Sequence, residues 1–201
     1  MYTPAHFALP EDEAWRILGE TGAGFFVRAT PTGLRSVFVP FLVHEGALAT
    51  HVARGNDWWR DASPDEEVLV VVSAASAYVS PRYYPSRLAD PRVVPTWNYV
   101  AVEVLGRLRV HEDPAWLAGQ IRRQTARFEA PGEPWRVEDA PADYIERQIG
   151  AIVGVSVAVT SITGKAKLSQ NRPDEDRRSV RAHLAAGSPE ERRVASWMTD
   201  D

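Results

Sequence analysis

The sequence predicts an α+β fold in which an antiparallel sheet closes into a barrel and helices lie at its periphery. The first observation is a series of β-rich segments joined by very short turns, which favour antiparallel neighbours. The second is that helical patterns concentrate after residue 113, so that helices are added late to the sheet. With 201 residues and no evident linker, residues 1–201 are expected to form a single domain with C-terminal helices.

A short helix is expected first, because Pro10 is followed by three acidic residues that suit a helix N-terminus, and Gly22 and Gly24 end the pattern. Further along, residues 67–73 form an uninterrupted apolar run that is typical of a strand buried on both faces. Residues 97–111 alternate apolar with partly polar positions and predict one long strand. The shorter strands are expected at residues 25–29, 34–44, 47–53 and 77–80.

In the second half, Asp113 is expected to cap a helix that has Pro114 at its first position and ends near Glu129. Another helix is predicted from residue 140 to residue 150. The β-branched residues 152–162 then predict a strand. Two helices should follow, over 173–186 and after a cap at Ser188.

Composition excludes several classes of protein. The chain has no cysteine, which rules out disulfides, thiolate metal sites and cysteine nucleophiles. It has no apolar run of membrane-spanning length and no signal-peptide pattern at its start, so we expect a cytoplasmic protein without a membrane partner. The net charge of −4 does not favour DNA, and the local basic cluster is interleaved with acidic residues as on a salt-bridged helix face. That cluster contains Arg172, Arg177, Arg178 and Arg181.

The most informative polar run is residues 164–172, which follows the strand predicted at 152–162. Within eight residues it provides two ammonium groups, a hydroxyl, two carboxamides and a guanidinium, which suit a phosphate and the edge of a polar heterocycle. A solvated strand end that leads into a helix is the alternative, and composition alone leaves both interpretations open. The candidate ligand-binding residues of this run are Lys167, Ser169, Gln170 and Asn171.

A second polar run lies at residues 50–59, where a strand is expected to lead into a helix. His51 and Ala53 share one face of the strand, whereas Arg54 shares the other face with Thr50 and can either line a pocket or face solvent. The backbone N–H groups around Asn56 are suited to an anion at the start of the predicted helix.

A third cluster, residues 94–99, places Trp97 and Asn98 at the start of the long strand. An aromatic ring beside a carboxamide suits a ligand ring that is stacked and hydrogen-bonded, although an aromatic core anchor explains the pattern equally well. The chain has neither an HExxH motif nor a GxSxG motif, so no catalytic residue is assigned. A bound cofactor is the more promising source of chemistry.

These motifs together resemble the PaiB family, which is commonly labelled as FMN-binding negative transcriptional regulators. The resemblance rests on residues 50–59, 77–84, 94–99 and 164–172, with support from 1–7 and from Pro134 and Trp135. It implies a split β-barrel of the flavin-reductase-like, pyridoxamine-oxidase-like kind, assembled as a homodimer with FMN at the subunit interface. It also implies that the cofactor lies near His51, Ala53, Arg54 and Asn56, and that Lys167, Ser169, Gln170 and Asn171 complete the pocket from the same or the partner chain.

One residue departs from the pattern of the family. Many members carry a Thr-His or Ser-His pair before the proline of the second strand, whereas this chain has Phe38 followed by Val39 and Pro40. If that histidine touches cofactor or substrate in other members, Phe38 makes the pocket more apolar and the shared chemistry does not transfer.

A second branch of the same family binds heme instead of FMN. It includes piperazate synthases, which form an N–N bond from N5-hydroxyornithine, and other split-barrel relatives degrade heme. His51 would then be the axial ligand, and Lys167 and Arg172 would suit the propionates as well as they suit a phosphate.

The leading prediction is therefore an FMN-binding split-barrel protein, acting as a flavin-dependent oxidoreductase or as a regulator, with heme b as the alternative cofactor. The other predictions are a heme-dependent enzyme and a regulator that acts through protein partners. No helix-turn-helix with a basic face supports direct DNA binding. The sequence does not identify the small-molecule substrate.

Overall fold

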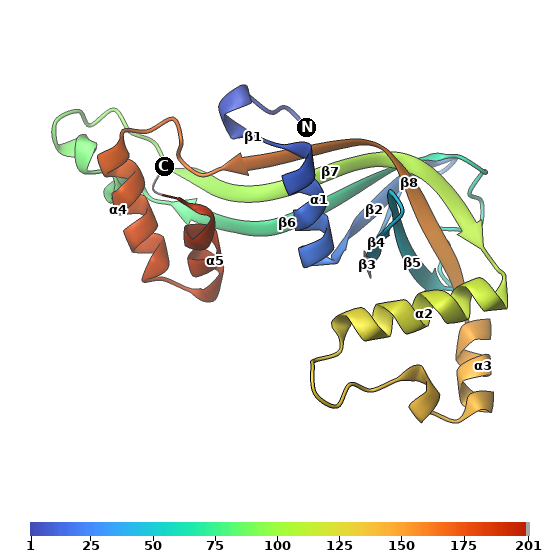
Figure 1. Ribbon diagram of the computed structural model, residues 1–201. Helices are drawn as coiled ribbons and strands as arrows, with labels where there is room; N and C mark the ends of the chain where they lie inside the picture. The colour runs from blue at the N-terminus through green and yellow to red at the C-terminus, as the bar shows by residue number, and fades with distance from the viewer. Residues whose placement is uncertain (200–201) are drawn as a thin grey trace. The chain divides into compact units, whose positions relative to one another are not determined.

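The computed structural model describes residues 1–199 and divides the chain into two compact units. The first unit comprises Met1–Ile17, Val72–Glu103 and the chain from Ile162 onward, and the second comprises Leu18–Val71 and Val104–Ser161. Three long strands, which Figure 1 shows as extended arrows, contribute residues to both units. They are β6 (Glu67–Val79), β7 (Thr96–His111) and β8 (Ile152–Lys167).

The sheet follows the order β3-β2-β6-β7-β8-β5-β4, and β1 pairs with β8 outside this path. Its antiparallel pairs follow from the short turns, because β2 and β3 are joined at Thr30 and Gly33. Phe25 faces Phe38 on one side and Val71 on the other, so three apolar side chains lie in one cross-strand row. The remaining strands of the second unit are β2 (Ala23–Thr30), β3 (Gly33–Pro40), β4 (Leu42–His44) and β5 (Ala47–Ala53).

The helices of the second unit are α2 (Pro114–Phe128), the 3₁₀ turn η4 (Val137–Asp139) and α3 (Ala142–Gly150). The predicted cap of α2 is confirmed, because Asp113 accepts hydrogen bonds from the backbone of Ala115 at 3.3 Å and of Trp116 at 3.1 Å. The Trp116 ring lies so close to Gly154 that a Cβ there would be 2.2 Å from it. Glycine at this position of β8 therefore lets α2 approach the sheet.

In the first unit, the end of β8 is covered on one edge by β1 (Ala8–Leu9), which places Ala8 opposite Lys165. Helix α1 (Glu11–Thr21) begins at the three predicted acidic residues. Helices α4 (Asp174–Ala185) and α5 (Pro189–Trp197) pack through the buried Val180, Leu184 and Val194. The short 3₁₀ elements are η1 (Ala5–Phe7), η2 (Pro81–Tyr83) and η3 (Pro85–Leu88).

Several predictions of strand boundaries were wrong. The segment 34–44 forms two strands, because Phe41 is buried between them instead of continuing the ladder. Residues 67–79 form one strand, β6, instead of two strands, and burial alternates along it. Only one face of β6 is therefore fully buried, and Val71 on the other face is 37% exposed.

Two further predictions were wrong near the polar runs. The strand predicted to end at residue 162 continues to Lys167, because pairing with β1 extends the ladder. Turns, rather than a helix, follow Ala53. The side chain of Asn56 stabilises one of these turns by accepting a hydrogen bond from the backbone of Trp58. The basic helix face is ion-paired at Arg177 and Asp174, but Asp176 points inward and accepts hydrogen bonds from Ser86 at 2.6 and 3.0 Å.

No helix among residues 1–199 combines the length and the apolar character that a membrane span requires.

Candidate anion and cofactor site

The candidate site of the first unit begins with Lys165, near the end of β8. Its side chain is buried, and Nζ donates a 3.0 Å hydrogen bond to the carbonyl of Tyr2. The same ammonium lies 5.4 to 6.0 Å from the ring centres of Tyr2, Phe7 and Tyr99. These cation–π contacts stabilise the charge without neutralising it.

Lys167 lies two residues further along the same face of the strand. Its Nζ donates to the carbonyl of Trp97 at 2.9 Å and to the hydroxyl of Thr96. Burial lowers the pKa of Lys167, and the positive charges of Lys165 and Arg172 lower it further. Of the three ammonium protons, two meet acceptors among the described residues, which leaves one to donate to a ligand.

Arg172 completes this group, which we call the cationic cluster: Lys165, Lys167 and Arg172. Its guanidinium lies 4.7 Å from the ring centre of Tyr84. In the part of the chain from residue 1 to residue 199, no carboxylate forms an ion pair with any of these cations. Uncompensated, partly buried positive charge of this kind is suited to an anionic ligand.

Two buried hydroxyl groups, those of Ser169 and Tyr84, lie next to the cationic cluster. Ser169, with a φ of +67°, places its Oγ 3.1 Å from both side-chain polar atoms of Asn98. Tyr84 is fully buried, and its hydroxyl makes no hydrogen bond of ordinary geometry with any residue from 1 to 199, although Arg172 and Ser169 lie near it. Burial, the largest cause, raises the pKa of Tyr84, so the phenol stays protonated and is available as a donor.

The carboxamides of the predicted site differ in their contacts. Gln170 accepts a 2.6 Å hydrogen bond from the backbone of Leu168 and donates a 2.7 Å bond to the carbonyl of Ala166, so its side chain stabilises the bend after β8. Asn171 is exposed at the start of the loop before α4. Trp97 is 54% exposed and packs edge to face with Tyr78, so it is not the core anchor of the alternative interpretation.

In the second unit, Arg54 is held by its own chain. Its guanidinium donates to the carbonyls of Gly150 at 2.9 Å and Ile152 at 3.1 Å, and it forms a 2.6 Å ion pair with Glu112. Asn56 accepts a 2.8 Å hydrogen bond from the backbone of Trp58. Ala53 is exposed at the end of β5.

His51 lines a separate hollow of about 300 Å³ in the second unit, together with Phe128 and Trp135. Its buried Nδ1 makes no hydrogen bond of ordinary geometry with any described residue, although Gln124 lies close enough to influence the ring. Burial lowers the pKa of His51, so the imidazole is neutral at pH 7. A neutral imidazole beside apolar rings suits a flat ligand or a metal ion.

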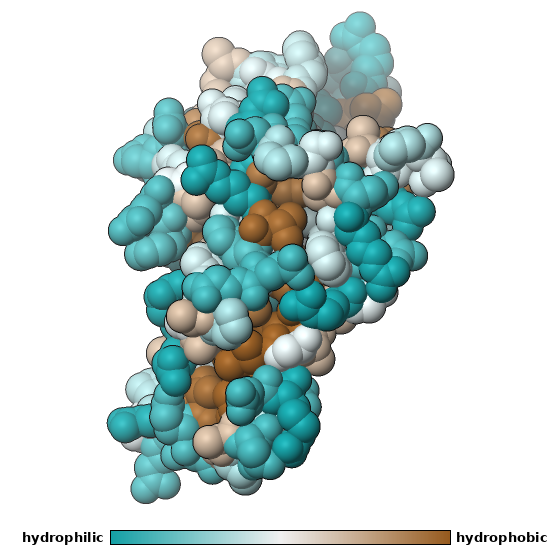
Figure 2. All heavy atoms as spheres, turned by 90° about the vertical axis from the view of Figure 1, so that its right-hand side faces the viewer, coloured by the Kyte–Doolittle hydropathy of each residue, from teal (hydrophilic) through white to brown (hydrophobic). Residues whose placement is uncertain are grey.

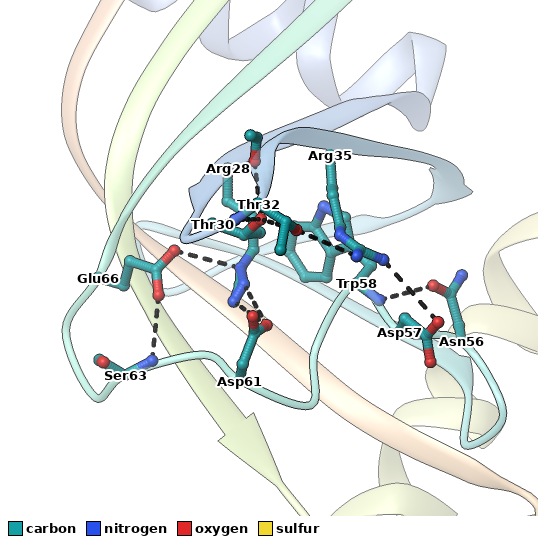
Figure 3. A network of polar contacts seen from close by, with 11 residues as sticks. Arg28, Thr30, Thr32, Arg35, Asn56, Asp57, Trp58, Asp61, Ser63 and Glu66 are labelled. Carbon is teal, nitrogen blue, oxygen red and sulfur yellow. Dashed lines mark hydrogen bonds and ion pairs between the residues drawn. The ribbon is translucent and has the colours of Figure 1, made fainter.

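The loop that carries Asn56 is anchored by Arg28, a residue that the sequence did not reveal as functional (Figure 3). The guanidinium of Arg28 is completely buried and contacts Asp61 at 2.6 Å and Glu66 at 3.2 Å. It also lies 5.9 Å from the ring centre of Trp58. The sequence offered one signal that Arg28 would be buried: it lies two residues after Phe26 and therefore shares the inward face of β2.

The predicted site residues thus fall into two groups. Six of them lie in the first unit and four in the second, where His51 and Arg54 line different hollows. The part that each residue plays in a shared pocket stays a prediction. The first group is Trp97, Asn98, Lys167, Ser169, Gln170 and Asn171, and the second is His51, Ala53, Arg54 and Asn56.

A family model described as "Putative FMN-binding domain" matches residues 1–161. The match covers both polar runs before β8 but ends before the cationic cluster. A relative that aligns with the whole chain is the protease synthase and sporulation protein PAI 2 of Bacillus subtilis, which is 28% identical over 207 residues and is itself covered to 97%.

Two fungal relatives, both uncharacterized proteins, are more similar over shorter stretches. The one from Aspergillus fumigatus is 36% identical over 151 residues, which are 67% of this chain and 57% of the relative. The one from Emericella nidulans is 33% identical over 57% of this chain and 51% of the relative. The matching part of this chain therefore spans little more than half of the length of these relatives.

Solved structures show the fold. The FAD and heme binding protein of Mycobacterium smegmatis superposes with a TM-score of 0.61 at 16% identity, covering 89% of this chain and 79% of that one. The flavocytochrome Anf3 of Azotobacter vinelandii superposes with a TM-score of 0.58 at 15% identity, covering 80% and 69%. The predicted α+β split-barrel fold is confirmed.

Proposed function

The chain belongs to the family described as "Putative FMN-binding domain", and we propose that it binds FMN with the phosphate at the cationic cluster. One observation carries this proposal: the cluster holds Lys165, Lys167 and Arg172 without a carboxylate partner among the described residues. A phosphate dianion would supply the missing negative charge and accept several charge-assisted hydrogen bonds. The donor set therefore fits the cofactor.

Each residue of the cluster has its own task in this proposal. Lys167 donates the ammonium proton that no acceptor within residues 1–199 takes, and Arg172 presents its guanidinium to the same anion. Lys165 contributes charge from a buried position that a ligand does not need to touch. The exposed ring of Trp97, beside the buried Asn98, provides a surface for the flat flavin ring.

Bound FMN would supply electron and hydride transfer, and the protein would supply orientation and electrostatics. We therefore favour a flavin-dependent oxidoreductase over a regulator without catalysis. The test is oxidation of NADH or NADPH by the FMN-loaded protein, measured beside a sample without FMN. If the loaded protein binds FMN but transfers no electrons to any acceptor tried, the regulator proposal replaces the enzyme proposal and FMN binding stands.

A homodimer is part of the proposal. The apolar row of Phe38, Phe25 and Val71 is exposed by 60, 52 and 37%, and the two phenylalanine rings pack edge to face at 5.1 Å. Phe38, which replaces the histidine of many family members, therefore belongs to an apolar surface suited to a second copy.

Light scattering tests this assembly directly. We expect a mass of about twice 22.3 kDa for the native chain. Phe38→Lys should shift the mass toward one chain, because it places a charge in the apolar row. The control Leu88→Lys, which changes an even more exposed apolar residue at 83%, should leave the mass unchanged. A native monomer would overturn the dimer and the interfacial cofactor with it.

Heme is the second candidate cofactor, because His51 is a neutral imidazole that lines an apolar hollow. FMN ranks ahead of heme because the matching family model is described as an FMN-binding domain. A visible spectrum of the purified protein, supplied with each cofactor in turn, separates the candidates. Flavin bands that need the cationic cluster support our proposal, and a Soret band that disappears in His51→Gln would replace it with the heme proposal.

A further inference from the structure

A cavity of about 790 Å³ lies between helices α2 and α3 in the second unit. None of its lining residues belongs to the cationic cluster, and no part of the proposed FMN function uses it. Aliphatic side chains form its floor and walls, chiefly Leu117, Val137, Ile145 and Ile149. Figure 2 shows hydrophobic atoms between hydrophilic ones in the lower part of the view, at the height where α2 and α3 lie in Figure 1.

The cavity arises from small residues on facing helices. Ala115 and Ala118 line it from α2, one helical turn apart, and Ala142 lines it from α3. Side chains of this size cannot fill the space that leucines would fill at an ordinary helix contact. Helix α3 consequently has no buried residue, although Ile145 and Ile149 share one of its faces.

Four of the five charged side chains that line the cavity form ion pairs within the chain, and the fifth, Glu146, is exposed to water on α3. Arg54 pairs with Glu112 at one side, and Arg122 pairs with Glu138 at 2.5 Å. Arg54 additionally holds the carbonyl of Gly150, the last residue of α3. A ligand that enters between these pairs needs no charge of its own.

A protein partner fits this surface poorly. The four rim side chains are 41 to 59% exposed, so a partner that covered the hollow would have to desolvate two ion pairs. Interface cores are depleted in charged residues, whereas a small molecule can fill the apolar hollow and leave the ion pairs in water. A volume of 790 Å³ also lies within the range of about 300 to 1,000 Å³ that is typical of small-molecule sites.

We propose that this cavity is a second binding site, which takes a neutral, mainly hydrocarbon small molecule independently of FMN. The site is a cleft between two helices with aliphatic walls and two ion pairs at its mouth. The ligand is held by burial of its hydrocarbon surface, and the apolar walls disfavour charged competitors because these would lose their hydration without gaining a partner.

The test uses the neutral dye N-phenyl-1-naphthylamine, whose fluorescence rises when it leaves water, and the full-length protein. Ala118→Leu fills the cavity and should weaken dye binding at least about tenfold, since it removes the space that the dye would occupy. The matched control is Ala126→Leu, which makes the same change on an exposed position of α2 outside the cavity lining and should bind dye like the native protein. Ala142→Leu fills the cavity from α3 and keeps the test valid if Ala118→Leu does not fold.

FMN content and mass by light scattering are measured on the same samples. Loss of dye binding in both filled variants, with unchanged FMN content and mass, supports the second site. Equal dye binding in the filled variants and the control overturns it. A change of mass in the filled variants with unaltered dye binding also overturns it, because the hollow then receives a second copy of the chain. Failure of FMN binding in the native protein leaves this result unaffected, so the two proposals fail separately.

Discussion

In the second unit, Arg28 and Arg54 each pair with carboxylates of the same chain. Within residues 1–199, the contacts of Lys165, Lys167 and Arg172 in the first unit are with carbonyls, a hydroxyl and aromatic rings. The residue types are similar, and all five side chains are at least partly buried. The difference lies in charge balance, because Arg28 and Arg54 are neutralised by carboxylates and, within the described residues, the cationic cluster is not.

This contrast separates structural cations from binding cations. A buried guanidinium with carboxylate partners stabilises the loop or helix that supplies them, and a ligand would have to displace those partners. Cations without such partners keep their attraction for an anion. Mutations in the second unit should therefore affect stability, and those in the first unit should affect FMN affinity.

The largest effect on stability is expected for Arg28→Met. Removing the buried guanidinium leaves Asp61 and Glu66 without their partner and should lower the free energy of unfolding by about 3 kcal/mol, measured by urea denaturation. The control Arg35→Met changes the cross-strand neighbour of Arg28, which is 43% exposed with a loose 3.8 Å ion pair, and should cost less than about 0.5 kcal/mol. Equal losses of unfolding free energy in the two variants would show that the buried ion pairs of Arg28 do not stabilise the fold.

The next effect is expected for Lys167→Met, and it concerns binding. Loss of a charge-assisted hydrogen bond to phosphate should raise the Kd for FMN about 10- to 100-fold, measured by flavin fluorescence titration. Stability should not fall, because burial and the neighbouring cations already disfavour this ammonium. A variant that binds FMN like the native protein would remove Lys167 from the site.

Arg54→Met should show the opposite behaviour. It loses two hydrogen bonds to carbonyls and one partly exposed ion pair, so the free energy of unfolding should fall by about 1 kcal/mol. Its FMN affinity should stay within about twofold of the native value, because those bonds hold α3 and β8 instead of a ligand. A loss of FMN affinity as large as that of Lys167→Met would show that Arg54 contributes to the FMN site.

The smallest effect is a pH dependence. Burial lowers the pKa of Lys167 below its usual value of 10.5, so FMN affinity should fall as pH rises through this lowered pKa and the ammonium loses its charge. In the cofactor-free protein, the unfolded chain keeps that proton up to higher pH than the folded chain. Stability should therefore rise over the interval between the lowered pKa and 10.5.

Lys167→Arg is the control for this titration, because the guanidinium stays charged throughout the interval. Its FMN affinity should be independent of pH where that of the native protein declines. Parallel pH profiles of the two proteins would assign the titration to another group.

Much of the fold could be predicted from the sequence because the signals were local. Asp113 and Pro114 marked the start of α2, and the turns at residues 31–33 and 45–46 marked antiparallel hairpins. The end of β8 could not be predicted, because its last residues are held by β1, which lies more than 150 residues away in the chain. Pairing between distant segments leaves no periodic pattern in either one.

The candidate site was predictable in composition but not in charge balance. The run from Lys165 to Arg172 contained the right groups, yet the sequence could not show that Gln170 satisfies its own backbone or that Lys165 lies among three aromatic rings. Arg54 appeared in an equally polar run and is neutralised by Glu112, which is 58 residues distant. Only the folded structure shows which cations form ion pairs with a carboxylate.

The central claim is that the cationic cluster recognises the phosphate of FMN. It is tested most directly by comparing the affinities of FMN and of riboflavin, which lacks the phosphate, in the native protein and in Lys167→Met. We expect the native protein to bind FMN at least about tenfold more tightly than riboflavin, and the variant to lose most of that difference. Equal affinity for the two flavins in the native protein, or an undiminished preference for FMN in Lys167→Met, would contradict the claim.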